Sequence, residues 1–457
     1  MKTVFILIFG IVVGLLHGNS QELQKNDSLY SGLWLGTLKV TDQMQLQLAF
    51  EITEKEDGLY AAKMNVIEQK AFDIPMDECT ISDDSIYVLL KSAGIEYHGS
   101  YYPDKGTIHG TYSQGGRHFE LNMARVEKLP LEINRPQTPV RPFPYKEENI
   151  LFENQNAGIS LAGTLTMPKE GIKFPAAILI AGSGRTDRNE TGMGHFLLLS
   201  DFLTRNGYAV LRYDKRGVGE SGGNYLSATS FDFADDVVSA LAYLKSRPEI
   251  DKKRIGLIGH SEGALLAPMV AAKHQNDVFF VVLMGGIGVS GSELLLKQAG
   301  DIARINGVPE EEIIEMVKKN AQYYKIVMEG EPDSITVKKL KAYDPEINES
   351  TIHTLILPWF RSFLAIDPGP FLQQTKCPVL AITGENDLQC APEENLKGIE
   401  SALKMGGHTN HRILTLPGLN HLFQTSKTGS PYEYDQLEEI MAPQVLDLVV
   451  EWMNALQ

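Results

Sequence analysis

The first pattern along the chain is an alternation of apolar and polar positions. Apolar side chains occupy Met44, Leu46, Leu48, Phe50 and Ile52, and glutamines and a glutamate separate most of them. This period of two predicts a strand with one buried and one solvated face. Further short apolar runs, separated by Gly, Asp and Ser, lie at 86–90, 95–101, 107–112 and 119–123. Residues 21–127 are therefore predicted to form a small antiparallel β domain, either a barrel or a sandwich.

A proline-rich stretch, residues 128–148, separates this region from a second pattern and is predicted to be a linker, because proline favours extended backbone. Beyond it, short apolar strands alternate with helical patterns, which is typical of a mainly parallel sheet covered on both faces. Residues 149–457 are therefore predicted to form one α/β domain. The expected strands are 176–180, 209–213, 255–258, 279–284, 379–383 and 413–416, and the expected helices include 196–205 and 231–245.

The alternation of strands and helices is interrupted at residues 290–375, where a long stretch has only helical pattern. This stretch is too long for an ordinary crossover between two core strands. Insertions of this size inside a compact domain usually have a structure and a function of their own. We expect residues 290–375 to form a helical cap over a binding site.

The N-terminus has the three parts of a secretory signal peptide. A basic start at Lys2 precedes an apolar run from Val4 to Leu16, and small residues follow at Gly18 to Ser20. Residues 1–20 are predicted to be cleaved, and the mature protein to be periplasmic or secreted. The competing interpretation is a membrane anchor, but the apolar run is shorter than the roughly 20 residues that a spanning helix needs. No cysteine follows the run, so a lipoprotein anchor is not supported, and we expect no stable membrane anchor.

Composition and charge exclude several classes of function. The chain has 457 residues and a formal net charge of −16, so most of its surface would repel nucleic acid, and no nucleic-acid partner is expected. The three cysteines are an odd number in a chain that is predicted to be exported, which excludes a complete disulfide framework. No Cys-x-x-Cys or His-Glu-x-x-His spacing occurs. We therefore predict no metal site.

The strongest chemical motif is Gly259-His260-Ser261-Glu262-Gly263, which follows a predicted strand and precedes a predicted helix. Strand, Gly-x-Ser-x-Gly and helix in this order form a nucleophile elbow. The two glycines allow a turn sharp enough to expose the Ser261 hydroxyl at the carboxyl end of the sheet. Ser261 is therefore the predicted nucleophile, although a serine in this place is in most chains only a helix cap.

A serine nucleophile requires a histidine base and a carboxylate that orients the histidine. Two later strands are followed by suitable residues, namely Asp387 and His421. Strand ends at one edge of a parallel sheet converge, and the order Ser, Asp, His is that of α/β-hydrolases. Glu385, in the same loop as Asp387, is the competing acid. Each residue alone has an ordinary interpretation as a turn former or a solvated side chain, and only their joint occurrence favours a triad.

Acyl transfer also needs hydrogen-bond donors for the developing oxyanion. We predict the backbone amides of Glu262, directly after the nucleophile, and of Ser183, in the Gly182-Ser183-Gly184 loop after an earlier strand. This loop lacks the Gly-Lys-Ser/Thr ending of a phosphate-binding loop, which argues against nucleotide binding.

Residues 150–457 resemble the α/β-hydrolase superfamily, in particular bacterial carboxylesterases that carry an extra N-terminal β domain. The matching stretches are LIAGSGRTDRNE (179–190), YDKRGVGES (213–221), GHSEG (259–263), PWFRSFLAIDP (358–368) and GENDLQ (384–389). The resemblance implies esterase activity, no cofactor and a helical cap, and it implies that Asp214 and Arg216 are structural. Trp359 and Phe360 are candidates for the wall of an acyl pocket, with cap packing as the alternative.

Together these features predict an exported serine hydrolase that cleaves carboxylic esters through an acyl-enzyme. The substrate would be a small-molecule, carbohydrate or lipid ester, and the sequence leaves the oligomeric state open. One alternative is an aminopeptidase-like serine peptidase of the prolyl oligopeptidase type, for which the acidic run Glu310 to Glu312 could bind a substrate amino terminus. The other is a non-enzymatic β-rich binding module with a degenerate hydrolase domain.

Overall fold

The computed structural model describes residues 30–40, 45–55, 58–69, 71–82, 84–130, 134–190 and 192–456. These residues form two compact units. Unit 1 extends to Asn134 and includes Ile305–Pro309, and unit 2 contains Arg135–Arg304 and Glu310–Gln457. The predicted signal peptide, residues 1–20, lies outside the described residues. Within the described ranges, no helix is both long and apolar enough to cross a membrane.

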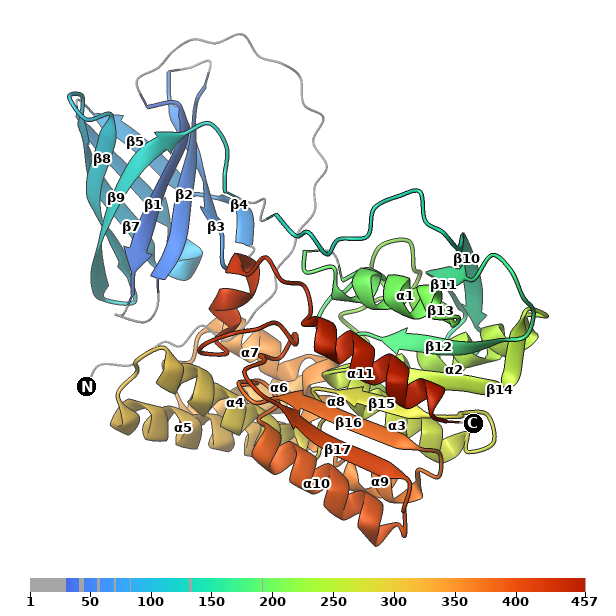
Figure 1. Ribbon diagram of the computed structural model, residues 1–457. Coiled ribbons are helices and arrows are strands. Elements are labelled where there is room, and N and C mark those ends of the chain that lie inside the picture. The colour runs from blue at the N-terminus through green and yellow to red at the C-terminus, as the bar shows by residue number, and fades with distance from the viewer. Residues whose placement is uncertain are drawn as a thin grey trace. The chain divides into compact units, whose positions relative to one another are not determined.

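Unit 1 is built on one continuous antiparallel sheet, which curls on itself (Figure 1). The order of its strands is β4-β3-β2-β1-β9-β8-β7-β6-β5. A single curled sheet corresponds to the barrel alternative rather than to a sandwich of two sheets. The strands are β1 (Gly32–Lys39), β2 (Gln45–Glu54), β3 (Tyr60–Val66), β4 (Ala71–Pro75), β5 (Glu78–Ser82), β6 (Ser85–Leu90), β7 (Ile95–Tyr102), β8 (Thr107–Gln114) and β9 (Arg117–Val126).

The interior of unit 1 is apolar and rich in aromatic rings. Trp34 is fully buried, and its indole N–H donates to the carbonyl of Tyr30 at 2.8 Å. Phe50 and Tyr97 are also fully buried, with ring centroids 5.4 Å apart. In β2, Leu46, Leu48, Phe50 and Ile52 are all buried, so the alternating pattern does mark the inner face of the sheet.

Unit 2 contains the predicted α/β sheet, with strand order β10-β11-β13-β12-β14-β15-β16-β17. From β13 onward neighbouring strands are parallel, whereas β10 and β11 are antiparallel. The strands are β10 (Lys146–Asn154), β11 (Ile159–Met167), β12 (Phe174–Ile180), β13 (Ala209–Tyr213), β14 (Ile250–His260), β15 (Val281–Met284), β16 (Val379–Gly384) and β17 (His411–Leu416).

Helices cover both faces of this sheet because its strands are apolar on both sides. One hydrophobic core lies between the sheet and α1 (His195–Arg205) and α11 (Pro443–Asn454). The other lies between the opposite face and α2 (Ser230–Ser246), α3 (Glu262–Lys273) and α10 (Pro392–Met405). The predicted fold class is confirmed.

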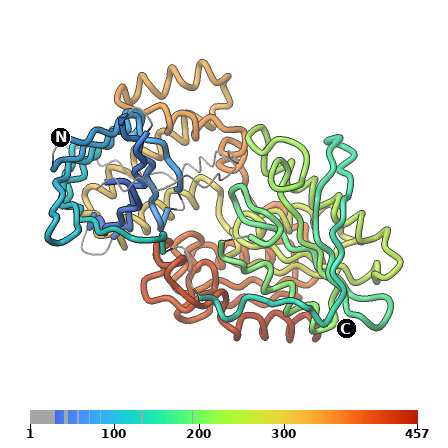
Figure 2. The backbone as a smooth tube through the Cα atoms, turned by 90° about the horizontal axis from the view of Figure 1, so that it is seen from above, coloured from blue at the N-terminus to red at the C-terminus, as the bar shows by residue number. Residues whose placement is uncertain are grey.

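Between β15 and β16, the predicted cap region consists of helices, which are the yellow and orange coils of Figure 2. They are α4 (Gly291–Ile305), α5 (Glu310–Met328), α6 (Asp333–Tyr343), α7 (Glu349–Ile356), α8 (Pro358–Ala365) and α9 (Gly369–Gln374). Part of this region has its own apolar cluster, to which α5, α6, α7 and α8 contribute side chains.

The structure refines the predicted linker at residues 128–148. β10 begins at Lys146, inside that range, and unit 2 already begins at Arg135. Arg135 donates to the carbonyl of Leu437 at 2.8 Å, and Gln137 donates to that of Met441 at 2.7 Å. These hydrogen bonds anchor the stretch to unit 2, which proline content alone does not indicate.

Candidate active site

Ser261 lies at a sharp turn between the end of β14 and the start of α3. Its backbone has φ 56° and ψ −119°, a conformation that side-chain-bearing residues rarely adopt. A Cβ atom on Gly259 would lie 2.0 Å from the carbonyl oxygen of Gly263, and one on Gly263 would lie 1.9 Å from that of Ile180. Both glycines are therefore required for the turn, which places Ser261 at the carboxyl edge of the parallel strands.

The predicted acid and base are in direct contact. Asp387 Oδ2 and His421 Nδ1 lie 2.8 Å apart, and both side chains are almost completely buried. Asp387 Oδ1 accepts hydrogen bonds from the backbone amides of Gln389 at 2.8 Å and Cys390 at 2.7 Å. Burial alone would raise the pKa of Asp387, but His421 and these amides outweigh it and hold the pKa below its usual value. The carboxylate is thus fixed in its charged form against the imidazole.

The competing acid, Glu385, has a different environment. Its side chain is exposed, and Oε2 accepts a hydrogen bond from the backbone amide of Gly418 at 3.0 Å. Asp387, two residues later, is the carboxylate that bonds to His421. The geometry therefore favours Asp387 as the acid.

Several contacts bring Ser261 next to this acid–base pair. The Ser261 amide donates to the carbonyl of Met284 at 2.9 Å, and a Cβ on the following Gly285 would lie 3.1 Å from Cε1 of His421. Burial raises the pKa of the Cys390 thiol, and Ser261 opposes part of this rise. In the described part of the chain no hydrogen bond joins Ser261 Oγ to His421. Such bonds are often long before substrate binds.

The segments that contain the two predicted oxyanion donors both approach the nucleophile. Glu262 is the first residue of α3, so its amide is one of those that the helix leaves without an intrahelical acceptor. The loop after β12 passes close to Ser261, because a Cβ on Gly182 would lie 3.1 Å from that of Ser261. Ser183 follows in this loop and is exposed. The positive end of the α3 dipole also favours negative charge at this place.

The sequence does not predict the contact between the side chains of Lys215 and Glu262, which joins the segment after β13 to the start of α3. Both are almost fully buried, and Lys215 Nζ lies 3.1 Å from Glu262 Oε2. Lys215 Nζ also donates to the carbonyl of Gly182 at 2.5 Å. Trp359, on α8, donates from Nε1 to Glu262 Oε1 at 2.7 Å, so it contacts the site through its polar edge. Phe360 is buried in the cap cluster, as the packing alternative predicts.

A buried acid and two imidazoles lie beside the predicted triad. Burial raises the pKa of Glu190 to about 8, although Lys215 and a hydrogen bond with the Gly182 backbone oppose the rise. His195 contacts the Glu190 carboxylate. Burial, assisted by the nearby His421, lowers the pKa of His260 to about 3. His260 is therefore neutral, and its Nε2–H donates to the backbone carbonyl of His421 at 2.9 Å.

Two buried groups have donor atoms close enough together to hold a metal ion. The atoms of each group lie within 4.8 Å of one another, and the groups are Glu190, His195 and His260, and Asp387, Cys390 and His421. In the second group the carboxylate and imidazole already bond to each other. The absence of a metal or cofactor stays a prediction.

The two residues expected to be structural form buried ion pairs with other residues of unit 2. Asp214 pairs with Arg188 at 2.6 Å, and Arg216 pairs with Asp236 at 2.7 Å. Both pairs stabilise the segment of chain that follows β13.

All three cysteines, which lie within the described residues, are free thiols.

Comparison with known proteins agrees with this fold. The family described as serine aminopeptidase, S33, matches residues 189–426, more than half of the chain. Esterase EstD of Thermotoga maritima is 27% identical over 308 residues, which are 66% of this chain and 68% of that protein. The bifunctional esterase/perhydrolase DCH of Acinetobacter calcoaceticus is 24% identical over 246 residues, 50% of this chain and 79% of its own length.

Among solved structures, Est1E of Butyrivibrio proteoclasticus with bound ferulic acid has a TM-score of 0.41 and 20% sequence identity. The match covers 66% of this chain and 96% of Est1E. The family match spans the elbow, the acid loop and the histidine loop, and it confirms the resemblance inferred from the five sequence stretches. The chain belongs to the serine aminopeptidase S33 family of α/β-hydrolases.

Proposed function

We propose that the protein is a serine hydrolase that cleaves carboxylic esters, with Ser261 as nucleophile, His421 as base and Asp387 as the acid that orients it. The observation that carries this proposal is the strained elbow at Ser261, beside a buried His421–Asp387 pair with a 2.8 Å contact. Such strain persists only where the surrounding structure maintains it, and it is concentrated at functional sites.

The proposed reaction has two halves. Ser261 Oγ attacks the ester carbonyl carbon while His421 Nε2 accepts the serine proton, and Asp387 stabilises the imidazolium through Nδ1–H. The amides of Glu262 and Ser183 donate to the oxyanion. When the carbon–oxygen bond breaks, His421 returns the proton to the leaving alcohol. Water then attacks the acyl-enzyme by the same route, releasing the acid and restoring Ser261.

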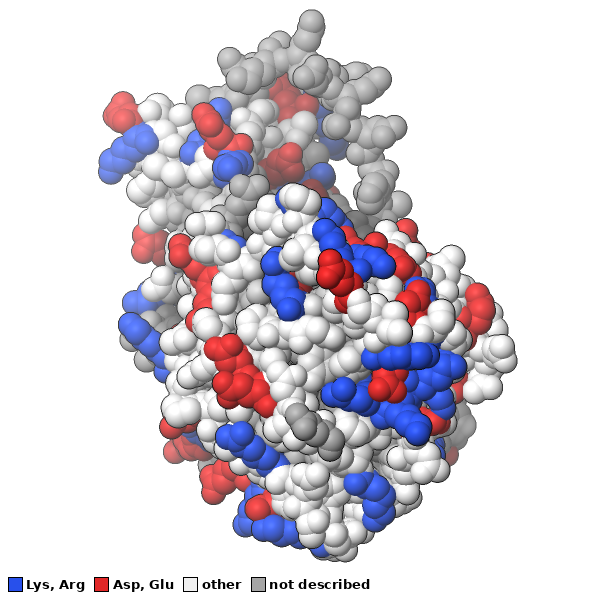
Figure 3. Space-filling view, turned by 45° about the vertical axis from the view of Figure 1, so that its right-hand side comes forward, with Lys and Arg blue, Asp and Glu red and all other residues white. Residues whose placement is uncertain are grey.

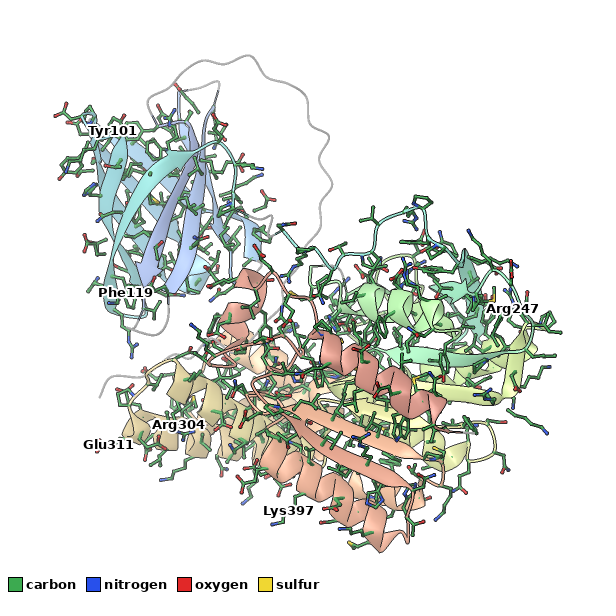
Figure 4. All side chains as sticks on the ribbon, in the orientation of Figure 1. Tyr101, Phe119, Arg247, Arg304, Glu311 and Lys397 are labelled. Carbon is green, nitrogen blue, oxygen red and sulfur yellow. The ribbon has the colours of Figure 1, made fainter. Side chains whose placement is uncertain are left out.

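The choice of esters over peptides has two supports. Relatives named as esterases cover much of the chain, although the family description names an aminopeptidase. The acidic run that would bind a peptide amino terminus lies at the start of α5, and its first residue already has an ion-pair partner. Glu310 is ion-paired with Arg304 at 2.9 Å, and Figure 4 shows Arg304 and Glu311 at the outer ends of α4 and α5.

A paired substrate panel tests this proposal. Purified protein is assayed against p-nitrophenyl esters of increasing acyl length and against aminoacyl p-nitroanilides, with Ser261→Ala as the control for background hydrolysis. We expect kcat/KM for the best ester to exceed that for every anilide, and Ser261→Ala to be inactive on both. Faster turnover of an aminoacyl anilide would replace the esterase proposal with the peptidase alternative.

Export is part of the proposal and rests on the sequence of residues 1–20. The full chain is expressed in a bacterial host, and the mass of the protein recovered outside the cytoplasm is measured. We expect a mature chain that begins near Gln21. The variant Leu15→Arg, which interrupts the apolar run, should remain unprocessed in the cytoplasm. An intact N-terminus in the exported wild-type protein would contradict cleavage, and recovery of the wild-type protein in the cytoplasm alone would contradict export.

A further inference from the structure

Lys215 is a buried amine without a part in the proposed proton transfers. It follows β13, is only 4% exposed and packs over the ring of Phe233. Its Nζ donates to the backbone carbonyl of Gly182 and lies 3.1 Å from Glu262 Oε2. Lys215 therefore joins the two segments that supply the predicted oxyanion donors.

The contact with Gly182 fixes the direction of the Ser183 amide. The Gly182 carbonyl and the Ser183 N–H belong to one planar peptide group, in which they point in opposite directions. Because Lys215 holds the carbonyl at 2.5 Å, the N–H points away from Lys215. Rotation of the Ser183 amide is thereby restricted before substrate binds.

The second donor, the Glu262 amide, is held through its own side chain. Besides Lys215, the Glu262 carboxylate accepts hydrogen bonds from Ser230 Oγ and Trp359 Nε1, both at 2.7 Å. Ser230 begins α2 and Trp359 lies on cap helix α8. Three separate elements thus fix the first residue of α3, whose amide follows the nucleophile.

Stability alone does not account for this arrangement. Burying two opposite charges costs desolvation free energy, and replacing such a pair by apolar residues of similar volume is often neutral or stabilising. A charged pair that contacts both oxyanion segments can instead supply orientation. Fixed donors need little reorganisation when charge develops on the substrate.

We propose that the Lys215–Glu262 pair is a positioning device that holds the Ser183 and Glu262 amides in the orientation required for the oxyanion. This inference rests on the proposed function. Lys215 and Glu262 act through the backbone amides, and Trp359 connects the same carboxylate to the cap. The pair should therefore affect the transition state more than substrate binding.

The test uses the double variant Lys215→Met/Glu262→Gln, which removes both charges with little change in volume and leaves no unpaired buried charge. We expect kcat for a p-nitrophenyl ester to fall about 10- to 100-fold, with KM changed less than about threefold, since loss of one oxyanion donor costs roughly 10²- to 10³-fold. The assay is repeated with the matching thionoester, whose sulfur is a weaker hydrogen-bond acceptor. The oxoester-to-thionoester ratio of kcat/KM should fall at least about fivefold.

The matched control is Arg216→Met/Asp236→Asn, which removes a buried ion pair of similar burial near the same strand. This control should leave the oxoester-to-thionoester ratio unchanged. A folded Lys215/Glu262 variant with unchanged kcat, or with equal losses on both esters, would overturn the positioning role. If the double variant does not fold, Glu262→Gln alone is measured with the same two esters and the same criteria. Failure of the proposed function is distinct, because Ser261→Ala would then retain activity.

Discussion

The two sheets of this protein differ in how many polar side chains are buried at them. In the curled sheet of unit 1, as far as it is described, Asn65 is the one buried polar side chain, and ion pairs such as Lys63–Asp73 are exposed. In unit 2, buried charged or titratable residues follow the carboxyl ends of successive strands: Arg188, Asp214, Lys215, Arg216, Glu262, Asp387 and His421. Burial of charge requires compensation by paired groups. This sheet edge therefore carries both the structural ion pairs of Asp214 and Arg216 and the residues of the proposed catalytic triad.

The charged side chains on the surface show no concentration like that of the buried charges in unit 2. On the face shown in Figure 3, acidic and basic side chains are interspersed rather than gathered into one patch of a single sign. Exposed pairs of this kind contribute little to stability. The informative charges in this protein are the buried ones in unit 2.

The largest expected effect comes from removing the nucleophile. Ser261→Ala should lower kcat for p-nitrophenyl esters by about 10⁴-fold or more, because loss of a triad serine leaves only binding and oxyanion stabilisation. Thermal unfolding should show an intact fold, since the substitution removes only the hydroxyl oxygen and leaves the backbone turn and the core packing in place. Retention of more than about one hundredth of wild-type kcat would remove Ser261 from this role.

The acid loop offers a comparison between two carboxylates. Asp387→Asn should lower kcat by about 10³- to 10⁴-fold, because the amide no longer holds the required imidazole tautomer. Glu385→Gln should retain activity within about threefold, since its carboxylate contacts Gly418 rather than His421. Steady-state kinetics of both variants measure the ranking, and the reverse order would assign the acid to Glu385.

Buried and exposed ion pairs should differ in their contribution to stability. Arg216→Met leaves Asp236 buried and unpaired and should lower the free energy of unfolding of unit 2 by about 3–5 kcal/mol. Lys63→Met, in unit 1, should cost no more than about 1 kcal/mol, because the pair with Asp73 is exposed. Urea denaturation of the two variants gives the comparison. Equal costs would mean that the contrast between the units has no energetic basis.

His260 should make unit 2 sensitive to acid. Its pKa is lowered to about 3 in the folded protein, mainly by burial, whereas an unfolded histidine has a pKa near 6.5. Between these values the unfolded chain binds the extra proton, so stability falls as pH decreases from about 6.5 toward 3, by up to about 1.4 kcal/mol per pH unit. His260→Gln, whose amide can still donate to the His421 carbonyl, should flatten this dependence.

The measurement is urea denaturation at pH 7.5, 6 and 5, followed by the fluorescence of Trp359 and Trp452 in a Trp34→Phe background. This background restricts the signal to unit 2. His98→Gln, at an exposed position in unit 1, is the control and should behave as the parent protein does. Identical slopes for His260→Gln and the parent would contradict the role of the buried imidazole.

The smallest effect is expected from removing unit 1. We propose that unit 2 is catalytically self-contained, so a fragment of residues 134–457 should hydrolyse small p-nitrophenyl esters within about threefold of the full chain, because every proposed catalytic group lies in it. A fragment that starts at residue 146 should be less stable, because it lacks the Arg135 and Gln137 hydrogen bonds. A folded 134–457 fragment without activity would show that unit 1 contributes to the site.

The sequence predicts the parts of the site that follow local rules. Ser261 lies in a recognisable pentapeptide, and Asp387 and His421 each follow an apolar strand. The Lys215–Glu262 contacts have no such signal, because Gly182, Ser230 and Trp359 come from separate segments and meet only in the folded chain. That part of the site forms through contacts between segments that are distant in the sequence, so the spacing of residues along the chain does not reveal it.

Some of the strands that the sequence does not predict, unlike the largely buried β3 and β11, have few buried side chains. β10 reads KEENILFEN and is polar at most positions, and β4 and β5 bury little of their side chains. A periodic hydrophobic pattern arises from buried side chains. Strands that are held mainly by backbone hydrogen bonds to a neighbouring strand therefore cannot be recognised from that pattern. The predicted linker accordingly extended into β10.

The central claim is that Ser261 is the reactive serine of unit 2, and covalent labelling tests it most directly. The wild-type protein and the Ser261→Ala variant are treated with a fluorophosphonate probe, digested and mapped by mass spectrometry. The account predicts one probe adduct per chain on Ser261 in the wild type and no adduct in the variant. An adduct on another residue, or equal labelling of both proteins, would contradict it.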